Sequence, residues 1–162
     1  EVHVGREDYD KARVFLERAI SLAEDADLAR THVDALRNMG ILHVATASWA
    51  EAEEALTGAK AAAKKLNLRQ MMAQVERSFG DMEAQRAGAG AEQSEGAEKR
   101  AVEAYRRAAD GFEACGYDLE AALSLEQLAA FLERRGSSDE ALSVREAAGA
   151  LRARHGVEAP TP

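Results

Sequence analysis

The sequence predicts an all-α fold in which antiparallel helix pairs stack in series, and three observations support this prediction. First, proline occurs only twice in 162 residues, at Pro160 and Pro162, so no proline interrupts a helix before the tail. Second, alanine supplies about a fifth of the chain, and alanine favours helices more strongly than any other residue. Third, small residues recur at a fixed spacing, which is typical of repeat architectures.

The fixed spacing is visible in the alanines. Ala52 follows Ala12 at the same interval at which Ala141 follows Ala101. The interval from Ala52 to Ala101 is longer, and the additional residues fall in the glycine-rich, polar segment 87–96, which we interpret as a loop insertion. A single helix pair buries too little apolar surface to be stable alone, so the pairs are expected to stack on one another.

The helices follow from the apolar pattern and from the residues that end it. Gly116 and Gly136 are typical stop signals, and the run Ser137-Ser138-Asp139 is expected to supply side chains that cap the last helix. Seven helices, or three and a half pairs, are predicted over residues 8–25, 28–45, 48–65, 67–87, 97–114, 117–135 and 138–154.

Composition excludes several classes of partner. The chain has 21 basic and 29 acidic residues and a net charge of −8, so it lacks the cationic surplus that nucleic acid requires. It contains no apolar run long enough to cross a membrane, and its one cysteine predicts neither an internal disulfide nor a cysteine metal cluster. We therefore expect a cytoplasmic repeat domain over residues 1–156, with no nucleic-acid or membrane partner and with a disordered tail over 157–162.

The sequence contains no constellation typical of an enzyme. Its four histidines include no pair four residues apart, and Cys115 has no second cysteine, so we expect a half-buried apolar role for that thiol. Gly88-Ala89-Gly90 lacks the Lys-Ser/Thr pair of a phosphate loop. Ser138 follows two arginines as a kinase site would, but capping is the favoured interpretation. We predict no enzymatic activity, no cofactor and no metal.

Each repeat carries a similar set of small and large residues. The best repeat has Leu36, Met39, Gly40, Trp49, Ala52, Leu56 and Ala59. The next has Phe79, Gly80, Ala101, Tyr105 and Ala108, and the last has Leu125, Leu128, Ala129, Gly136, Ala141 and Ala148. This combination resembles the tetratricopeptide repeat (TPR) family, and the period of about 40 residues resembles its long-repeat variety in bacterial regulatory proteins. The resemblance implies a right-handed α-solenoid.

Departures from the family pattern mark the two ends of the array. Arg145 occupies a position that normally holds a large apolar residue, which fits a last helix with one side facing water. At the other end, Val14, Phe15 and Ile20 belong to a helix that no full helix precedes. We expect these side chains to lack a cover, and we expect a homodimer to form through this helix.

The resemblance places partner binding in a concave groove that the first helix of each pair lines. Arg37 and Asn38 resemble the Lys-Asn couple with which some family members grip a peptide carboxylate, and Arg77 lies one repeat later. Glu126 and Gln127 do not complete such a clamp. The predicted groove residues are Asp34, Arg37, Asn38, Ile41, Val44, Gln74, Arg77, Ser78, Asp81, Gln85, Leu123, Glu126, Gln127, Ala130 and Glu133.

The function predicted from these features is protein–protein interaction: a scaffold that holds a peptide or protein segment in its concave groove, within a larger bacterial regulatory protein. One alternative is a regulatory domain that senses a small ligand or signalling peptide for a kinase, an ATPase or a transcription regulator. The other alternative is self-association. A polar open channel favours the peptide, whereas a closed apolar pocket favours the small ligand.

Overall fold

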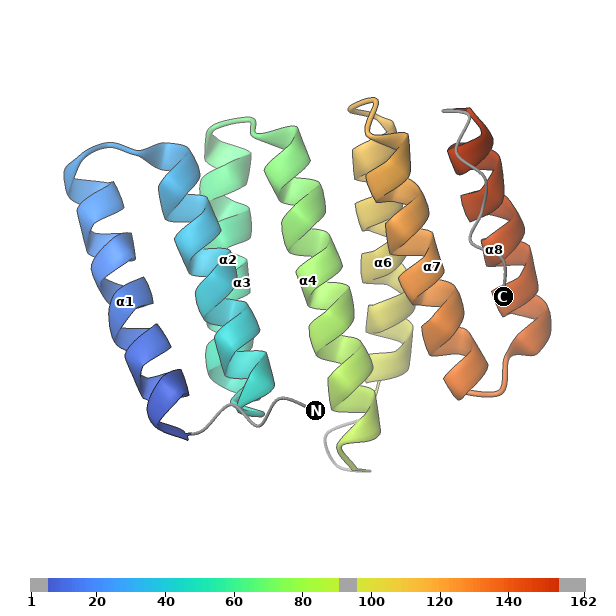
Figure 1. The fold of residues 1–162 in the computed structure, drawn as a ribbon, viewed down its shortest axis with the longest axis horizontal. Helices are drawn as coiled ribbons and strands as arrows, with labels where there is room; N and C mark the ends of the chain where they lie inside the picture. The colour runs from blue at the N-terminus through green and yellow to red at the C-terminus, as the bar shows by residue number, and fades with distance from the viewer. Residues whose placement is uncertain (1–5, 91–95, 155–162) are drawn as a thin grey trace. The chain divides into compact units, whose positions relative to one another are not determined.

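A computed structural model describes residues 6–90 and 96–154, and these residues form seven α-helices (Figure 1). Each predicted helix is present, and every end lies within two residues of its prediction. The helices are α1 (Arg6–Asp25), α2 (Ala29–Ala45), α3 (Trp49–Lys65), α4 (Arg69–Gly88), α6 (Ala97–Glu113), α7 (Asp118–Arg134) and α8 (Ser138–Ala153).

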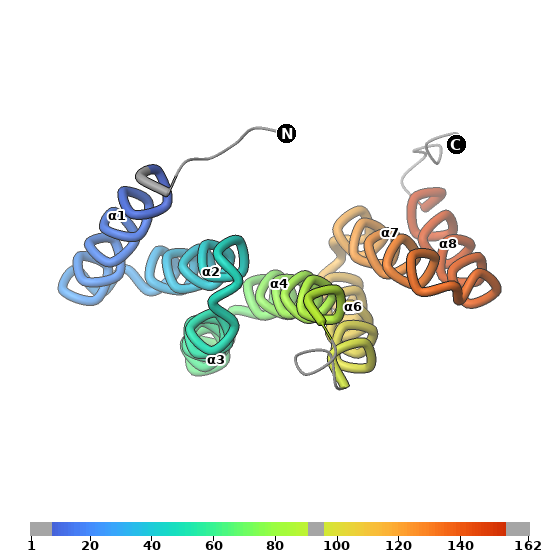
Figure 2. Tube along the Cα trace, turned by 90° about the horizontal axis from the view of Figure 1, so that it is seen from below, coloured from blue at the N-terminus to red at the C-terminus, as the bar shows by residue number. Residues whose placement is uncertain are grey.

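The chain divides into two compact units, which are described separately. Unit 1 comprises residues 1–71, and within it α2 packs against both α1 and α3 (Figure 2). Unit 2 comprises residues 72–162 and holds most of α4 together with α6, α7 and α8, with α7 packing against both α6 and α8. The predicted insertion over 87–96 begins later than expected, because α4 continues to Gly88; residues 91–95 and the predicted tail lie outside the described residues.

One type of turn joins consecutive helices at five places. In each, a residue with positive φ follows the helix, and the amide of the next residue donates to a carbonyl five positions earlier, as in Leu28 N to Ala23 O at 2.8 Å and Ser137 N to Leu132 O at 3.0 Å. Within each half of the chain these turns recur at one constant interval. The positive-φ residues of these five turns are Asp27, Ala47, Asn67, Gly116 and Gly136.

The same turns also begin the next helix, and this corrects one prediction. The residue after the positive-φ position becomes the N-cap of the following helix, as Ser48 does for α3 and Ser137 does for α8. Neither N-cap side chain hydrogen-bonds to the helix. The prediction that Ser138 or Asp139 caps α8 is therefore wrong: both already lie within the helix, and the turn itself fixes where α8 starts.

Two glycines allow close helix crossings, one in each unit. A Cβ atom on Gly40 of α2 would lie 2.6 Å from the Leu56 side chain of α3. A Cβ atom on Gly80 of α4 would lie 2.6 Å from the Tyr105 ring of α6. Because real Cβ contacts are longer than this, an alanine at either position would force the neighbouring side chain to shift. This confirms that small residues recur where paired helices approach most closely.

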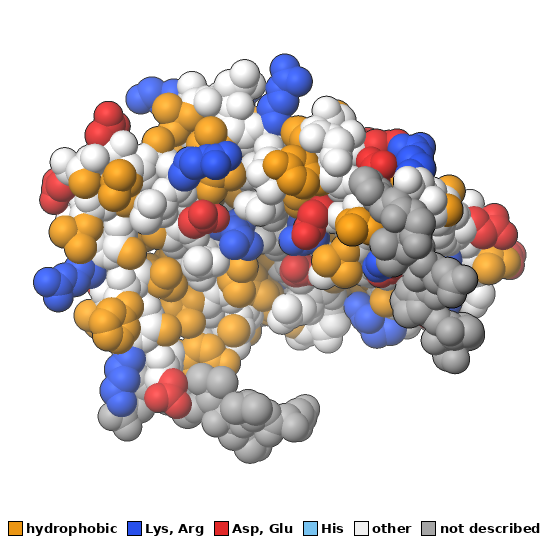
Figure 3. All heavy atoms as spheres, turned by 45° about the horizontal axis from the view of Figure 1, so that its top comes forward, with side chains coloured by type: hydrophobic (Ala, Val, Ile, Leu, Met, Phe, Trp, Pro, Cys, Tyr) orange, Lys and Arg blue, Asp and Glu red, His pale blue; other side chains and the backbone are white. Residues whose placement is uncertain are grey.

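The expected exposure of side chains on α1 and α8 is confirmed in part. Val14 and Phe15 on α1 are 57% and 73% exposed, while Ile20 is partly covered. Arg145 on α8 is exposed, as its polar character predicts. Figure 3 shows apolar side chains on the surface at the α1 side of the view. Among the described helices, none is long and apolar enough to cross a membrane.

Candidate functional site

In unit 1, the predicted groove residues lie on α2, where Arg37 is the central charged group. Its side chain is 24% exposed, and the nearest carboxylate oxygen, from Asp34 one turn earlier, lies 3.9 Å from Nε. That Nε atom is buried and has no hydrogen-bond partner among the described residues. Asn38 and Ile41 are exposed beside it, whereas Val44 is buried and offers no side chain to a partner.

In unit 2, the equivalent arginine, Arg77, already binds side chains of two other helices. Arg77 of α4 donates from Nη1 to Glu120 Oε2 of α7 at 2.6 Å, and its guanidinium lies 5.2 Å from the centroid of the Phe112 ring of α6. A charge-assisted hydrogen bond and a cation–π contact together hold the side chain in place. Arg77 therefore ties three helices together rather than presenting a free cation.

Asp81 of α4 is likewise committed to internal packing. Its Oδ1 accepts a hydrogen bond of 2.7 Å from the Tyr105 hydroxyl of α6. Burial raises the pKa of Asp81, although this hydrogen bond and the charge of Arg77 oppose the increase. Burial also raises the pKa of Tyr105, and the neighbouring Asp81 charge adds to the effect. The pair thus stays hydrogen-bonded with the phenol protonated.

The predicted acidic groove residues on α7 bind arginines of α8. Glu126 receives two hydrogen bonds from Arg152, at 2.6 and 2.9 Å. Glu133 receives two from Arg145, one of them at 2.7 Å. Bidentate pairs of this kind fix the geometry of both side chains. These carboxylates therefore link α7 to α8.

The remaining predicted residues of unit 2 form no cluster of functional groups. Ser78 is buried and its hydroxyl donates to the Gln74 carbonyl one turn earlier at 3.2 Å. Gln127 is partly buried, with an Oε1 atom that has no hydrogen-bond partner among the described residues. Of the others, Gln85 and Leu123 are exposed and Ala130 is partly buried.

Two ion pairs that were not predicted from the sequence join α4 to α6. Glu83 receives two hydrogen bonds from Arg100, at 2.9 and 3.0 Å, and Glu76 receives one from Arg107 at 2.9 Å. Both glutamates are buried. The signal was available, because two acids seven residues apart on one helix face two arginines seven residues apart on its antiparallel neighbour.

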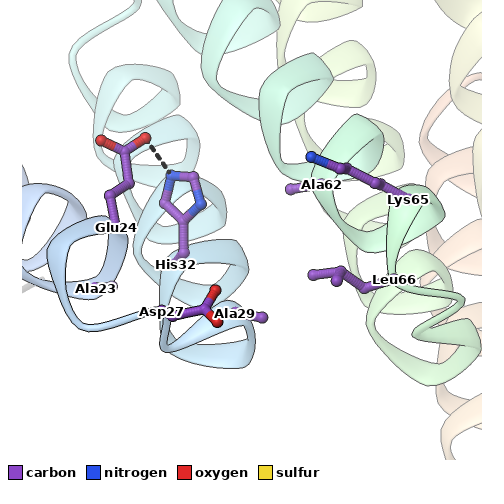
Figure 4. A pocket seen from close by; sticks show the side chains of 8 residues that line it. All are labelled: Ala23, Glu24, Asp27, Ala29, His32, Ala62, Lys65 and Leu66. Atoms are coloured by element: carbon purple, nitrogen blue, oxygen red, sulfur yellow. Dashed lines mark ion pairs between the residues drawn. The ribbon is translucent and has the colours of Figure 1, made fainter.

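Unit 1 contains a cavity of about 300 Å³ between the end of α1, the start of α2 and the end of α3 (Figure 4). His32 Nε2 lies 3.2 Å from Glu24 Oε1 at one side, and Lys65 and Leu66 approach from α3. Glu24, Lys65 and Leu66 are exposed, so the cavity opens to water. It is small and charged at its mouth, unlike the closed apolar pocket that a small ligand favours.

Other chemistry is sparse in the part of the chain that the structure describes. No group of three or more potential ligands there is placed to hold a metal ion. Cys115 is a free, half-buried thiol, as predicted.

Comparison with known proteins gives a structural likeness. No protein-family profile and no curated protein sequence matches the chain. The crystal structure of BtubC (BKLC) from P. vanneervenii is similar, with a TM-score of 0.70 at 19% identity; the match covers 95% of this chain and 60% of that one. The chain thus spans about 60% of the length of that protein. The likeness confirms the predicted fold class, an all-α, TPR-like arrangement of sequential antiparallel helix pairs.

Proposed function

We propose that this chain is a protein-interaction module that binds an acidic peptide segment on the exposed face of α2. A TPR-like helical repeat is consistent with such a module. The single observation that carries the proposal is the state of Arg37, whose buried Nε atom has no hydrogen-bond partner among the described residues. A ligand carboxylate would satisfy this donor once the Arg37 side chain, which is 24% exposed, turns outward, and guanidinium groups bind carboxylates with two parallel hydrogen bonds.

The contrast with unit 2 supports α2 as the binding face. Arg77 occupies the equivalent place one repeat later, and Glu120 already neutralises it. Arg37 instead lies beside two exposed side chains that suit a peptide. Asn38 can hydrogen-bond to a peptide backbone, and Ile41, which is 44% exposed, can pack against an apolar side chain one turn further along.

The setting we propose is a larger cytoplasmic regulatory protein of a bacterium, as the resemblance to long TPR repeats implies. Small-ligand sensing is the weaker alternative, because the cavity near His32 is open and charged. In this setting α2 recruits a partner, and any catalytic activity resides in other parts of the assembly.

Selection from a random peptide library tests the proposal. Peptides enriched on the wild type should share an acidic residue next to an apolar one. Arg37→Gln should weaken their binding about tenfold, which corresponds to about 1.4 kcal/mol, because one ion pair is lost. The matched control is Arg13→Gln on α1, which removes an exposed cation whose own acidic neighbours lie 3.9 Å away. Equal binding by wild type and Arg37→Gln would refute the proposal.

A further inference from the structure

The outer face of α1 combines exposed apolar side chains with cations. Phe15 and Leu22 are 73% and 57% exposed. In chain order, Lys11, Phe15, Arg18 and Leu22 are separated by four, three and four residues, which places all four on one side of the helix. Apolar side chains of this size in a row are costly to leave in water. None of the helices described in the structure covers Phe15 or Leu22.

Helix α6 shows within the same chain how such a face is covered. Since Ala101 of α6 corresponds to Ala12 of α1 in the repeat, Arg100 and Arg107 of α6 correspond to Lys11 and Arg18. In unit 2 those two arginines bind Glu83 and Glu76 of the covering helix α4.

The apolar positions agree with this correspondence. Phe15 of α1 corresponds to Ala104 of α6, which is buried, and Leu22 corresponds to Gly111, where a Cβ atom would lie 3.0 Å from the Ala73 side chain of α4. The face that α4 covers on α6 is therefore the face that stays exposed on α1. Its natural partner is an antiparallel helix with two carboxylates seven residues apart.

Helix α8 carries that pattern on an exposed surface. Asp139 and Glu146 are seven residues apart, both are exposed, and Leu142 between them is 60% exposed. Their spacings of three and four residues place them on one side of the helix. Arranged antiparallel to α1, these residues meet their complements in order: Asp139 faces Arg18, Leu142 faces Phe15, and Glu146 faces Lys11.

We propose that α8 of one copy packs on α1 of a second copy, so that this chain associates with itself head to tail. Pairing of α1 with a second α1 fits less well: when Arg18 faces Asp10 of the other copy, Phe15 faces Arg13 instead of an apolar side chain. Because α1 and α8 are different surfaces, a pair of copies still has one uncovered α1 face and one uncovered α8 face. Further copies can therefore add, and the assemblies grow as the protein concentration increases. This contact does not involve the α2 face and stands or falls separately from the proposed peptide binding.

Sedimentation velocity of the full chain over a range of concentrations tests the proposal. The wild type should show a sedimentation coefficient that increases with concentration. Lys11→Glu combined with Arg18→Glu should abolish this increase, and so should Asp139→Lys combined with Glu146→Lys, because each places like charges opposite one another. The matched control, Lys64→Glu combined with Lys65→Glu, reverses two exposed charges on α3 and should associate as the wild type does.

Mixing the two reversed variants gives the decisive result. Each variant repels itself, but the reversed α1 of one complements the reversed α8 of the other, so the mixture should associate again. Circular dichroism confirms that each variant is folded before mixing. A wild type that stays monomeric at high concentration, or folded variants that fail to associate when mixed, would overturn the proposal. Association that Asp139→Lys and Glu146→Lys leave unchanged would also overturn it.

Discussion

Units 1 and 2 use the same helix crossing but hold it in different ways. In unit 1, Gly40 receives the apolar side chain of Leu56. In unit 2, the equivalent Gly80 receives the Tyr105 ring, whose hydroxyl donates to Asp81. Ion pairs between buried glutamates of α4 and arginines of α6 flank that crossing. One repeat position is thus filled by apolar packing in unit 1 and by a polar network in unit 2.

The difference bears on the proposed peptide site. Asp81 and Arg77 of unit 2 correspond to Ile41 and Arg37 of unit 1, one repeat earlier in the chain. The unit 2 pair is consumed by internal contacts, whereas Ile41 is exposed and the Nε atom of Arg37 has no hydrogen-bond partner among the described residues. A repeat position that stabilises unit 2 therefore lacks these contacts in unit 1, which is why we place the proposed peptide site there.

The largest effect is expected at the two crossings. Gly80→Ala should destabilise the chain by about 2.5 kcal/mol, because the new methyl group meets three atoms of a ring that its hydrogen bond holds in place. Gly40→Ala should cost less, about 1.5 kcal/mol, because Leu56 can change rotamer. Both figures include the gain in helix propensity that alanine brings, about 1 kcal/mol.

Urea unfolding followed by circular dichroism measures both changes, and hydrogen exchange by mass spectrometry locates them. Faster exchange should appear in α4 and α6 for Gly80→Ala, and in α2 and α3 for Gly40→Ala. An equal loss of stability in the two variants would remove the distinction between the crossings.

An intermediate effect is expected for Tyr105→Phe. The substitution removes the hydrogen bond to Asp81 and leaves a partly buried carboxylate with one partner fewer, which should cost about 1.5 kcal/mol near pH 7. Leu56→Met serves as the control at the equivalent position of unit 1, since it removes no polar contact; it should cost less and show no comparable dependence on pH.

The pH dependence of this variant follows from the raised pKa of Asp81. A carboxyl group whose pKa is higher in the folded state than in the unfolded state makes the free energy of unfolding fall as pH rises between those two values. The hydrogen bond from Tyr105 lowers the pKa of Asp81 in the folded state. Its removal should therefore raise this pKa further, so that the free energy of unfolding keeps falling up to a higher pH. Wild type and Tyr105→Phe should therefore differ little near pH 3 and most near pH 7. A difference that does not change with pH would contradict this account.

The smallest effect is expected in the turns. Ala47 has a φ of 56°, a conformation that costs an L-residue about 1 kcal/mol, so Ala47→Gly should stabilise the chain by about 0.5 kcal/mol. Gly136 has a φ of 82° in the equivalent turn of unit 2, and Gly136→Ala should destabilise by about 1 kcal/mol. Thermal unfolding measures both shifts, and equal signs for the two variants would show that the turns are not equivalent.

The fold was predictable because its signals are local and repeated. The apolar pattern and the residues that end it placed every helix to within two residues. The turn at Ala47 was less visible, since nothing in an alanine marks a left-handed residue; only the backbone hydrogen bonds and the constant interval between turns show it. The capping role assigned to Ser138 failed for the same reason, because the turn rather than a side chain sets the start of α8.

The candidate site was predictable only in part. Family resemblance places Arg37 and Arg77 at equivalent positions, but it cannot show that Glu120, 43 residues further along the chain, neutralises Arg77. Such a pairing depends on which helices pack together and at what register. The acids of α7 were expected in the groove for the same reason, although arginines of α8 bind them.

The shared turn also bears on how such a chain changes length during evolution. Because the turn after α1 has the same backbone hydrogen bond and positive-φ residue as the turn after α2, a gene could gain or lose a segment of one helix and one turn without needing a new type of turn. A gain of one segment would, however, reverse the direction of every later helix and bring the wrong side chains to each crossing. Duplication of whole helix pairs avoids this penalty. The matched crossings, rather than the turns, therefore favour a pair of helices over a single helix as the unit of duplication.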